Sequence, residues 1–419
     1  MAKRPILATA FFLLAACSDS DAPAPEPNES PAADAGADAA VIEGSAVTLN
    51  AGDSSDADGS IVSFEWMQVS GPQAFIVNPD QAAAVIEPPL VDGAETLTFS
   101  VTVTDDDGAR DTDTVDVAVS QAPDDEVVEV RSEFDGFERA FSVYTPADYE
   151  RGDPAVVLLH GGGQSMRTIL LPERTTSRWL DLADRDGFLL IVPNGFNETL
   201  LDGIGDEQSW NDIRDDDTGR TSLEDDVGFL LSVLDAADAG RDYDPNSVFV
   251  TGSSNGGIMS MTMLIETPTR FEGAAAFIAA LPQETIPDPA APTPIMLLNG
   301  TLDQLILFGG GPVAGDGAPT RSVPATVDYF IEATNPDPSL TTTRTLIDAA
   351  PGDGCLIVET EYLAAGGDPA VTYYEARGGG HNVPDPTAPA FTPPAEALLG
   401  PRCRDANGVD LANAFRRGL

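Results

Sequence analysis

Residues 248–260 read Val248-Phe-Val-Thr-Gly-Ser-Ser254-Asn-Gly-Gly-Ile-Met-Ser260. This stretch opens with β-branched and aromatic residues, typical of a buried strand, and it closes with an apolar run that predicts a helix. Between the two lies Gly252-x-Ser254-x-Gly256, the pattern of a sharp turn that exposes a serine. A glycine- and serine-rich turn can produce the same five residues by chance, but the flanking strand and helix favour Ser254 as a nucleophile.

A nucleophilic serine needs a base within hydrogen-bond reach. The chain has two histidines, His160 and His381. His381 lies in Gly378-Gly-Gly-His381-Asn-Val-Pro, a loop directly after a predicted strand, where the base of such a site is expected. The alternative is a buried structural histidine.

The acid that orients the base is expected between Ser254 and His381. Asp303 fits best, because it follows the apolar strand Pro294-Ile-Met-Leu-Leu-Asn-Gly at its carboxyl end. The rivals are Asp316, in a glycine-rich loop, and Asp328, in a predicted helix.

Backbone donors for an oxyanion are predicted after another apolar strand, in Val156-Val-Leu-Leu-His160-Gly-Gly-Gly163-Gln. Gly162 is the first candidate and Gly163 the second, and Asn255 is expected to supply the other amide. His160 is expected to stabilise this loop. Together with Trp210 it is also a candidate substrate-binding residue, the alternative for Trp210 being a position in the core.

The chain divides by composition into five segments. We expect a lipoprotein signal peptide at 1–17, a flexible linker at 18–38, a β-sandwich at 39–120, an acidic linker at 121–129 and a catalytic domain at 130–419. Strand and helix patterns alternate in the last segment, which predicts an α/β fold, doubly wound around a mostly parallel sheet.

The first residues combine a basic start with a short apolar run that ends in Leu14-Ala-Ala-Cys17. This ending resembles the lipobox of bacterial lipoproteins, which implies cleavage before Cys17, acylation of Cys17 and a membrane contact through lipid alone. The alternative is an ordinary secretory signal. The protein is therefore expected to be exported and to be a cell-surface or periplasmic lipoprotein, with release into the medium as an alternative.

Asp-rich turns separate the short strands of the sandwich. The segment Leu49-Asn-Ala-Gly-Asp-Ser-Ser-Asp-Ala-Asp-Gly59 and the segment Val103-Thr-Asp-Asp-Asp-Gly108 resemble immunoglobulin-like PKD domains. Asp53, Asp56 and Asp58 are candidate ligands for a structural calcium ion. Acidic turn residues without a metal are the alternative.

The charge balance excludes one class of partner. With 21 Lys and Arg against 69 Asp and Glu the net charge is −48, which argues against binding to nucleic acid. Apart from Cys17 the chain has two cysteines, Cys355 and Cys403, which predict either one disulfide or two separate buried thiols.

Taken together, the motifs resemble the secreted polyhydroxybutyrate depolymerase / feruloyl esterase family of α/β-hydrolases over roughly 130–419. The motifs that carry the resemblance are Leu158-Leu-His-Gly-Gly-Gly-Gln, Ser209-Trp-Asn, Asp225-Asp-Val-Gly-Phe, Val250-Thr-Gly-Ser-Ser-Asn-Gly-Gly, Asn299-Gly-Thr-Leu-Asp303 and Gly379-Gly-His381. The resemblance implies a catalytic triad of Ser254, Asp303 and His381, no cofactor, and an ester-bearing polymer or oligosaccharide as substrate. The glycine-rich insertion that begins at Phe308, and Asn382 after the histidine, depart from the family pattern and leave the ester open. A serine peptidase on the same fold and a surface binding protein with an inert hydrolase domain are the alternatives.

Overall fold

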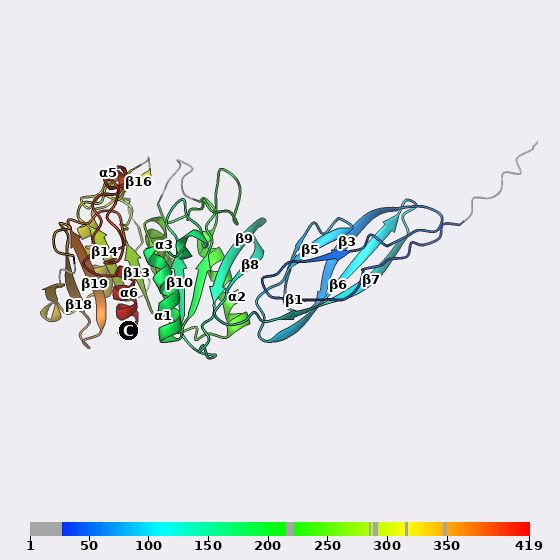
Figure 1. The fold of residues 1–419 in the computed structure, drawn as a ribbon, viewed down its shortest axis with the longest axis horizontal. Coiled ribbons are helices and arrows are strands. Elements are labelled where there is room, and N and C mark those ends of the chain that lie inside the picture. The colour runs from blue at the N-terminus through cyan, green and yellow to red at the C-terminus, as the bar shows by residue number, and fades with distance from the viewer. Residues whose placement is uncertain (1–26, 215–221, 285, 288–291, 315–316, 347–349) are drawn as a thin grey trace, which may run out of the picture.

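The chain forms two units that lie end to end, a slender β domain and a larger α/β domain (Figure 1). The computed structural model describes residues 27–214, 222–284, 286–287, 292–314, 317–346 and 350–419. None of the helices in these ranges is long and apolar enough to cross a membrane. The predicted lipid-attachment residue, Cys17, lies outside them.

The β domain packs a four-stranded sheet, ordered β1-β7-β6-β3, against a three-stranded sheet, ordered β2-β5-β4. Alternate residues of β6, from Leu97 to Val103, point into the shared core and are fully buried. The predicted sandwich is therefore confirmed. Its strands are β1 (Ala39–Ile42), β2 (Val47–Asn50), β3 (Ile61–Ser70), β4 (Phe75–Val77), β5 (Ala83–Glu87), β6 (Ala94–Asp105) and β7 (Arg110–Ser120).

The flexible linker predicted for 18–38 is wrong for its described part, 27–38. This segment lies along the sandwich, where Ala35 is buried. Carboxylates of β7 hold its backbone, since Asp111 accepts from the amide of Ala33 and Asp113 from that of Ala35. A segment without large apolar residues is thus ordered by backbone hydrogen bonds to acidic side chains, which composition does not reveal.

The α/β domain is built on a ten-stranded sheet, ordered β17-β18-β19-β14-β13-β12-β10-β11-β9-β8. The six central strands, from β19 to β11, pair in parallel, and the two further strands at each edge are joined to them through antiparallel pairs. These strands are β8 (Val127–Phe134), β9 (Phe137–Tyr144), β10 (Ala155–Leu159), β11 (Leu189–Pro193), β12 (Val248–Ser253), β13 (Gly273–Phe277), β14 (Ile295–Gly300), β17 (Thr342–Thr345), β18 (Leu356–Leu363) and β19 (Pro369–Arg377). A separate hairpin joins β15 (Gly311–Val313) to β16 (Gly317–Thr320) within the glycine-rich insertion.

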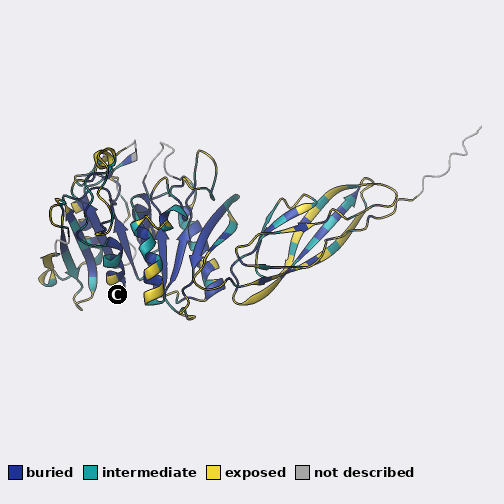
Figure 2. Ribbon diagram, viewed as in Figure 1, coloured by how far each residue is buried: buried dark blue, intermediate teal, exposed yellow. Residues whose placement is uncertain are grey.

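Helices cover both faces of this sheet, and Figure 2 shows its buried strands between more exposed helices. One core includes α2, α3 and α4, and the other includes α1 and α6. Along β10, Val157 faces the first core and Val156 the second, so every residue of the strand is buried. The helices are α1 (Arg178–Asp186), α2 (Asp226–Arg241), α3 (Asn255–Glu266), α4 (Val323–Thr334), α5 (Pro393–Leu399) and α6 (Gly408–Arg416), with short 3-10 turns η1 (Thr168–Leu170), η2 (Thr175–Ser177) and η3 (Pro338–Leu340).

The acidic linker predicted at 121–129 is also corrected. Its last three residues begin strand β8, and Ala122 is buried. The two domains meet here around the buried carboxylate of Glu43, which accepts from the amides of Val91 and Ala122 and pairs with Arg241 of α2. The connection between the domains is therefore a packed polar junction.

The strand order reverses at one point of the large sheet. The chain passes from β10 to β11 on one side and returns to β12 on the other side of β10. Leu159 pairs with Gly252, so the carboxyl ends of these two parallel strands lie together. In open α/β sheets this reversal is where ligands bind.

Candidate active site

Ser254 lies between β12 and α3 in a strained backbone conformation. Its φ of 57° and ψ of −123° fall where a residue with a side chain is rarely found. The amide of Ser254 donates to the carbonyl oxygen of Phe277 at 2.9 Å, which ties the turn to the neighbouring strand. The sharp strand–turn–helix geometry predicted from the sequence is therefore present.

The two glycines of the motif are required by space. A Cβ on Gly252 would lie 2.4 Å from the carbonyl oxygen of Gly256, and a Cβ on Gly256 would lie 2.3 Å from that of His160. No side chain fits at such distances. The helix after Ser254 can therefore start directly against the loop after β10.

The structure brings Ser254, His381 and Asp303 together. Nε2 of His381 lies 3.0 Å from Oγ of Ser254, and Nδ1 lies 2.7 Å from Oδ2 of Asp303. Oδ1 of Asp303 accepts from the amides of Leu305 and Ile306 at 2.8 and 2.9 Å. The carboxylate is thus held in place while its other oxygen faces the imidazole.

Of the two rival acids, Asp328 does not take this position. Asp328 is exposed on α4, and Asp316 lies outside the described residues. Asp303 is 3% exposed and His381 9% exposed, so their contact is shielded from bulk water. A hydrogen bond in such surroundings is stronger than one in water.

Two backbone amides beside Ser254 are free to bind an oxyanion. Within the part of the chain that the structure describes, the amides of Gly162 and Asn255 donate no hydrogen bond. A Cβ on Gly162 would lie 3.6 Å from Cβ of Asn255, so the two residues are neighbours. The second candidate, Gly163, is corrected, since its amide already donates to the carbonyl oxygen of Gln208 at 2.8 Å.

The side chain of Asn255 belongs to a buried network that sequence reasoning missed. Its Oδ1 accepts from the amide of Trp210 at 2.7 Å, and its Nδ2 donates to Oδ2 of Asp212 at 2.5 Å. Asp212 also pairs with Arg214. Burial raises the pKa of Asp212, and Arg214 opposes that rise. The network orients Asn255, and no local pattern in the sequence signals it.

His160 and Trp210 do not bind substrate directly, which corrects that prediction. Both are fully buried and neither lines the cavity at Ser254. Nε2 of His160 accepts from the amide of Gly195, Nδ1 donates to the carbonyl oxygen of Gly161, and Nε1 of Trp210 donates to the carbonyl oxygen of His160. Burial lowers the pKa of His160 to about 4, so this imidazole is neutral near pH 7. His160 instead stabilises the glycine loop after β10, as the sequence also predicted.

A cavity of about 400 Å³ opens beside Ser254. It is called the active-site cleft below. Its lining includes Gly161, Gly162, Gln164, Glu173, Arg174, Thr175, Thr176, Ser253, Ser254, Ile278, Leu305, His381, Asn382, Val383, Phe391, Leu399 and Arg402. The segments 173–176 and 391–402 carry no motif, so sequence reasoning did not find them.

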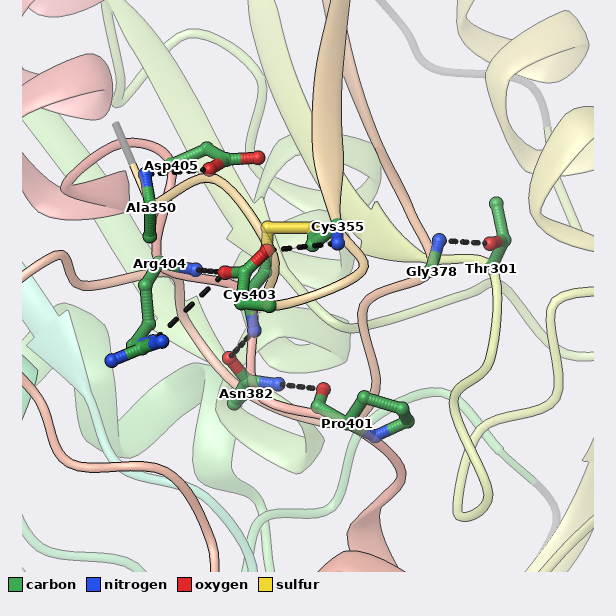
Figure 3. Close-up of a disulfide and its surroundings, with 10 residues drawn as sticks. Thr301, Ala350, Cys355, Gly378, Asn382, Pro401, Cys403, Arg404 and Asp405 are labelled. Atoms are coloured by element: carbon green, nitrogen blue, oxygen red, sulfur yellow. Dashed lines mark hydrogen bonds and ion pairs between the residues drawn. A yellow bond between two sulfur atoms is a disulfide. The ribbon is translucent and has the colours of Figure 1, made fainter. Parts of the chain in front are cut away.

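Cys355 and Cys403 form a disulfide, which decides between the two alternatives left by the sequence (Figure 3). Cys403 follows α5 and Cys355 precedes β18, with Cα atoms 5.3 Å apart. The amide of Cys403 donates to Oδ1 of Asn382, the residue after His381. The bridge therefore holds a segment that contacts the histidine loop.

No vacant metal centre is apparent among the described residues. The one group of three candidate ligands there is Cys355, Cys403 and Asp405, and its sulfur atoms are bonded to each other. Asp53, Asp56 and Asp58 form no such group. Calcium binding at these three carboxylates stays a prediction.

Comparison with known proteins agrees with this architecture. Residues 140–312 match the family described as Phospholipase/Carboxylesterase, and residues 35–119 match a family of PKD domains. The chain thus has an α/β-hydrolase fold preceded by a PKD-like β domain. The matched segment 140–312, which contains Ser254 and Asp303, is similar to the carboxylesterases of this family.

Individual relatives span different shares of the chain. It is 29% identical over 277 residues to "Putative esterase NocK" of Nocardia uniformis subsp. tsuyamanensis, covering 64% of this chain and 75% of the relative. A solved acetyl xylan esterase from Aspergillus awamori superposes with a TM-score of 0.40 and 14% identity, covering 58% of this chain and 89% of that one. LpqC, a poly(3-hydroxybutyrate) depolymerase from Bordetella parapertussis, gives a TM-score of 0.33 and 19% identity, with coverage of 43% and 67%.

Proposed function

We propose that this protein hydrolyses carboxylic esters through an acyl-enzyme on Ser254. His381 takes the proton from Oγ of Ser254 as the oxygen attacks the ester carbonyl. Asp303 holds the imidazole through Nδ1 and stabilises its charged form. His381 then protonates the leaving alcohol, and a water molecule that it activates releases the acid.

The amides of Gly162 and Asn255 are proposed to bind the oxyanion of the tetrahedral intermediate. They flank Ser254 and are free of other described partners. Fixed donors of this kind stabilise charge that develops in the transition state and need no reorganisation during the reaction.

One observation carries the proposal: a single imidazole contacts both the serine oxygen and a buried carboxylate. The distances of 3.0 and 2.7 Å lie within hydrogen-bond reach, and the serine stands on a strained turn. The carboxylesterase family match favours an ester over an amide as substrate.

The test compares Ser254→Ala with a matched serine variant away from the cleft, Ser232→Ala on α2. We expect Ser254→Ala to lower turnover of a 4-nitrophenyl ester by roughly 10⁴-fold or more, and Ser232→Ala to leave it unchanged. A peptide 4-nitroanilide should be cleaved far more slowly than the ester. Unchanged ester turnover in Ser254→Ala would refute the proposal, and a preference for the anilide would favour a peptidase.

The proposal extends to the substrate and the place of action. We propose esters linked to polymers or sugars, either feruloyl or acetyl groups on polysaccharides or a hydroxyalkanoate polyester, and an exported protein held on a membrane by lipid on Cys17. The motif resemblance between 158 and 381 supports the substrate, and the lipobox-like sequence supports the anchor. Release of acid from each polymer tests the first part. Fractionation of cells that express Cys17→Ser tests the second, because this variant should leave the membrane fraction.

A further inference from the structure

The active-site cleft contains two arginines in a chain dominated by acids. Arg174 and Arg402 both line it, whereas the protein carries a net charge of −48. Many arginines of the described residues form ion pairs with the abundant carboxylates, as Arg139 does with Asp226. Neither Arg174 nor Arg402 forms an ion pair with any described residue. Both guanidinium groups are therefore available to bind an anion that enters the cleft.

Arg402 is partly desolvated and short of hydrogen bonds. Its guanidinium carbon lies 4.0 Å from the centre of the Phe391 ring. Its Nε is buried and has no hydrogen-bond partner among the described residues. Burial lowers the pKa of Arg402, although an arginine remains charged at neutral pH. A buried donor without a partner is costly, so the guanidinium of Arg402 has unused hydrogen-bonding capacity beside the cleft.

The nearby acid, Asp385, stabilises the charge of Arg402 from a distance but forms no ion pair with it. The carboxylate of Asp385 accepts from the hydroxyl of Thr175 at 3.2 Å, and from the amide and hydroxyl of Thr387 at 2.8 and 2.7 Å. Among the described residues that line the cleft, Glu173 is the one acid, and it is exposed to water.

The backbone of Arg402 is fixed beside the histidine loop. The carbonyl oxygen of Pro401 accepts from the amide of Gly380 at 2.6 Å and from Nδ2 of Asn382 at 3.1 Å. Cys403, on the other side of Arg402, donates to Asn382 and forms the disulfide (Figure 3). Arg402 therefore has a defined position relative to His381, which lies between Gly380 and Asn382.

We propose that Arg402, assisted by Arg174, binds a carboxylate carried by the ester substrate. The inference rests on ester hydrolysis at Ser254 in the same cleft. A guanidinium binds a carboxylate through two parallel hydrogen bonds, and the Phe391 ring holds its plane. The acidic surface repels anions, so a substrate with a carboxylate needs a local cation at the site of reaction.

The test uses two pairs of esters, and in each pair one member carries a free carboxylate and the other carries its neutral methyl ester. 4-Nitrophenyl hydrogen glutarate and 4-nitrophenyl methyl glutarate place the difference on the acyl side. 4-Acetoxybenzoate and methyl 4-acetoxybenzoate, followed by acetate release, place it on the alcohol side. In at least one pair we expect kcat/KM to be roughly tenfold higher for the anionic ester.

Variants of Arg402 test whether this residue causes the preference for the anionic ester. Arg402→Gln should bring the ratio of the two kcat/KM values close to one, mainly by raising KM for the anionic ester, and should lower kcat/KM for the neutral ester far less. Arg402→Lys should retain part of the preference. The matched control is Arg404→Gln, two residues away and outside the cleft lining, which should keep the wild-type ratio.

Three results would overturn the inference. The first is that the wild type hydrolyses the anionic and the neutral ester of both pairs with equal kcat/KM. The second is that Arg402→Gln leaves the ratio of these two kcat/KM values unchanged. The third is an equal loss for both members of a pair in Arg402→Gln, which would mark a structural role. Competitive inhibition of wild-type turnover by glutarate but not by glutaramide tests the same contact without any variant. Failure of the wild type to hydrolyse any ester would instead refute the proposed function.

Discussion

The backbone amide of His381 donates a hydrogen bond of 2.5 Å to the carbonyl oxygen of Leu399. The loop that carries the imidazole thus rests on the end of α5. That segment is anchored four residues later by Cys403, through its disulfide to Cys355. The position of the proposed base therefore depends on a covalent link outside the cleft.

Removal of this link in Cys355→Ser/Cys403→Ser should lower both stability and kcat. The bridge joins residues 48 apart, and closing a loop of this length in the unfolded chain contributes up to about 4 kcal/mol. Denaturant unfolding and 4-nitrophenyl ester turnover measure the two effects. An unchanged unfolding midpoint together with unchanged kcat would contradict the prediction.

Gly256→Ala should abolish activity and destabilise the fold. The new Cβ would lie 2.3 Å from the carbonyl oxygen of His160 and 2.4 Å from that of Leu159, and overpacking of this kind costs about 1–3 kcal/mol. The shift would also separate Asn255 from Gly162. Gly309→Ala is the matched control, because a Cβ there meets nothing within 4 Å. Gly256→Ala should therefore unfold at a lower temperature and turn over the ester more slowly than Gly309→Ala. Equal values for the two variants would contradict the prediction.

The domain junction depends on Arg241. Its ion pair with Glu43 is buried, with side chains 3% and 0% exposed. Arg241→Met leaves a buried carboxylate without its cation and should cost about 3–5 kcal/mol. Arg151 pairs with Asp92 across the same junction, but both side chains are largely exposed, so Arg151→Ala should cost less than about 1 kcal/mol. Equal unfolding free energies for the two variants would disprove this contrast.

His160 should make the fold sensitive to mild acid. Its pKa is about 4 in the folded protein and about 6.5 in an unfolded chain. Between these values the unfolded chain binds more protons, so stability falls as the pH drops from about 6.5 towards 4. From pH 7 to pH 5 this group alone should cost about 2 kcal/mol.

Comparison of the wild type with His160→Gln isolates this effect from that of the many carboxylates. The variant is expected to be less stable at pH 7, because it disturbs the bond from the amide of Gly195. The difference in unfolding free energy between the two proteins should narrow at pH 5. A constant difference across this range would show that His160 does not titrate as its burial requires.

The central strands and most helices were predictable, whereas the periphery was not. Fully buried strands such as β10 and β12 consist of continuous apolar runs that stand out in the sequence. All four residues of β17 are exposed, and β1 has no fully buried residue, so their pairing leaves no hydrophobic pattern. Helix α5 is short and likewise has no buried residue.

The candidate nucleophile and the order of the triad residues along the chain could be predicted from local sequence patterns. Ser254 depends on a strand, a turn and a helix that are contiguous in the chain, so neighbouring residues encode its geometry. His381 followed from the scarcity of histidine and from its place after a strand.

The tertiary structure brought Asp303, the acid that the sequence favoured, to His381. It kept Gly162 and Asn255 as oxyanion donors and excluded Gly163, and it placed Arg402 beside His381. It also showed that Cys355 and Cys403 form a disulfide and that Trp210 lies in the core and not in the cleft. These outcomes depend on distances between segments far apart in the chain. Such distances are set by how helices and loops pack on the sheet, and no local pattern records them.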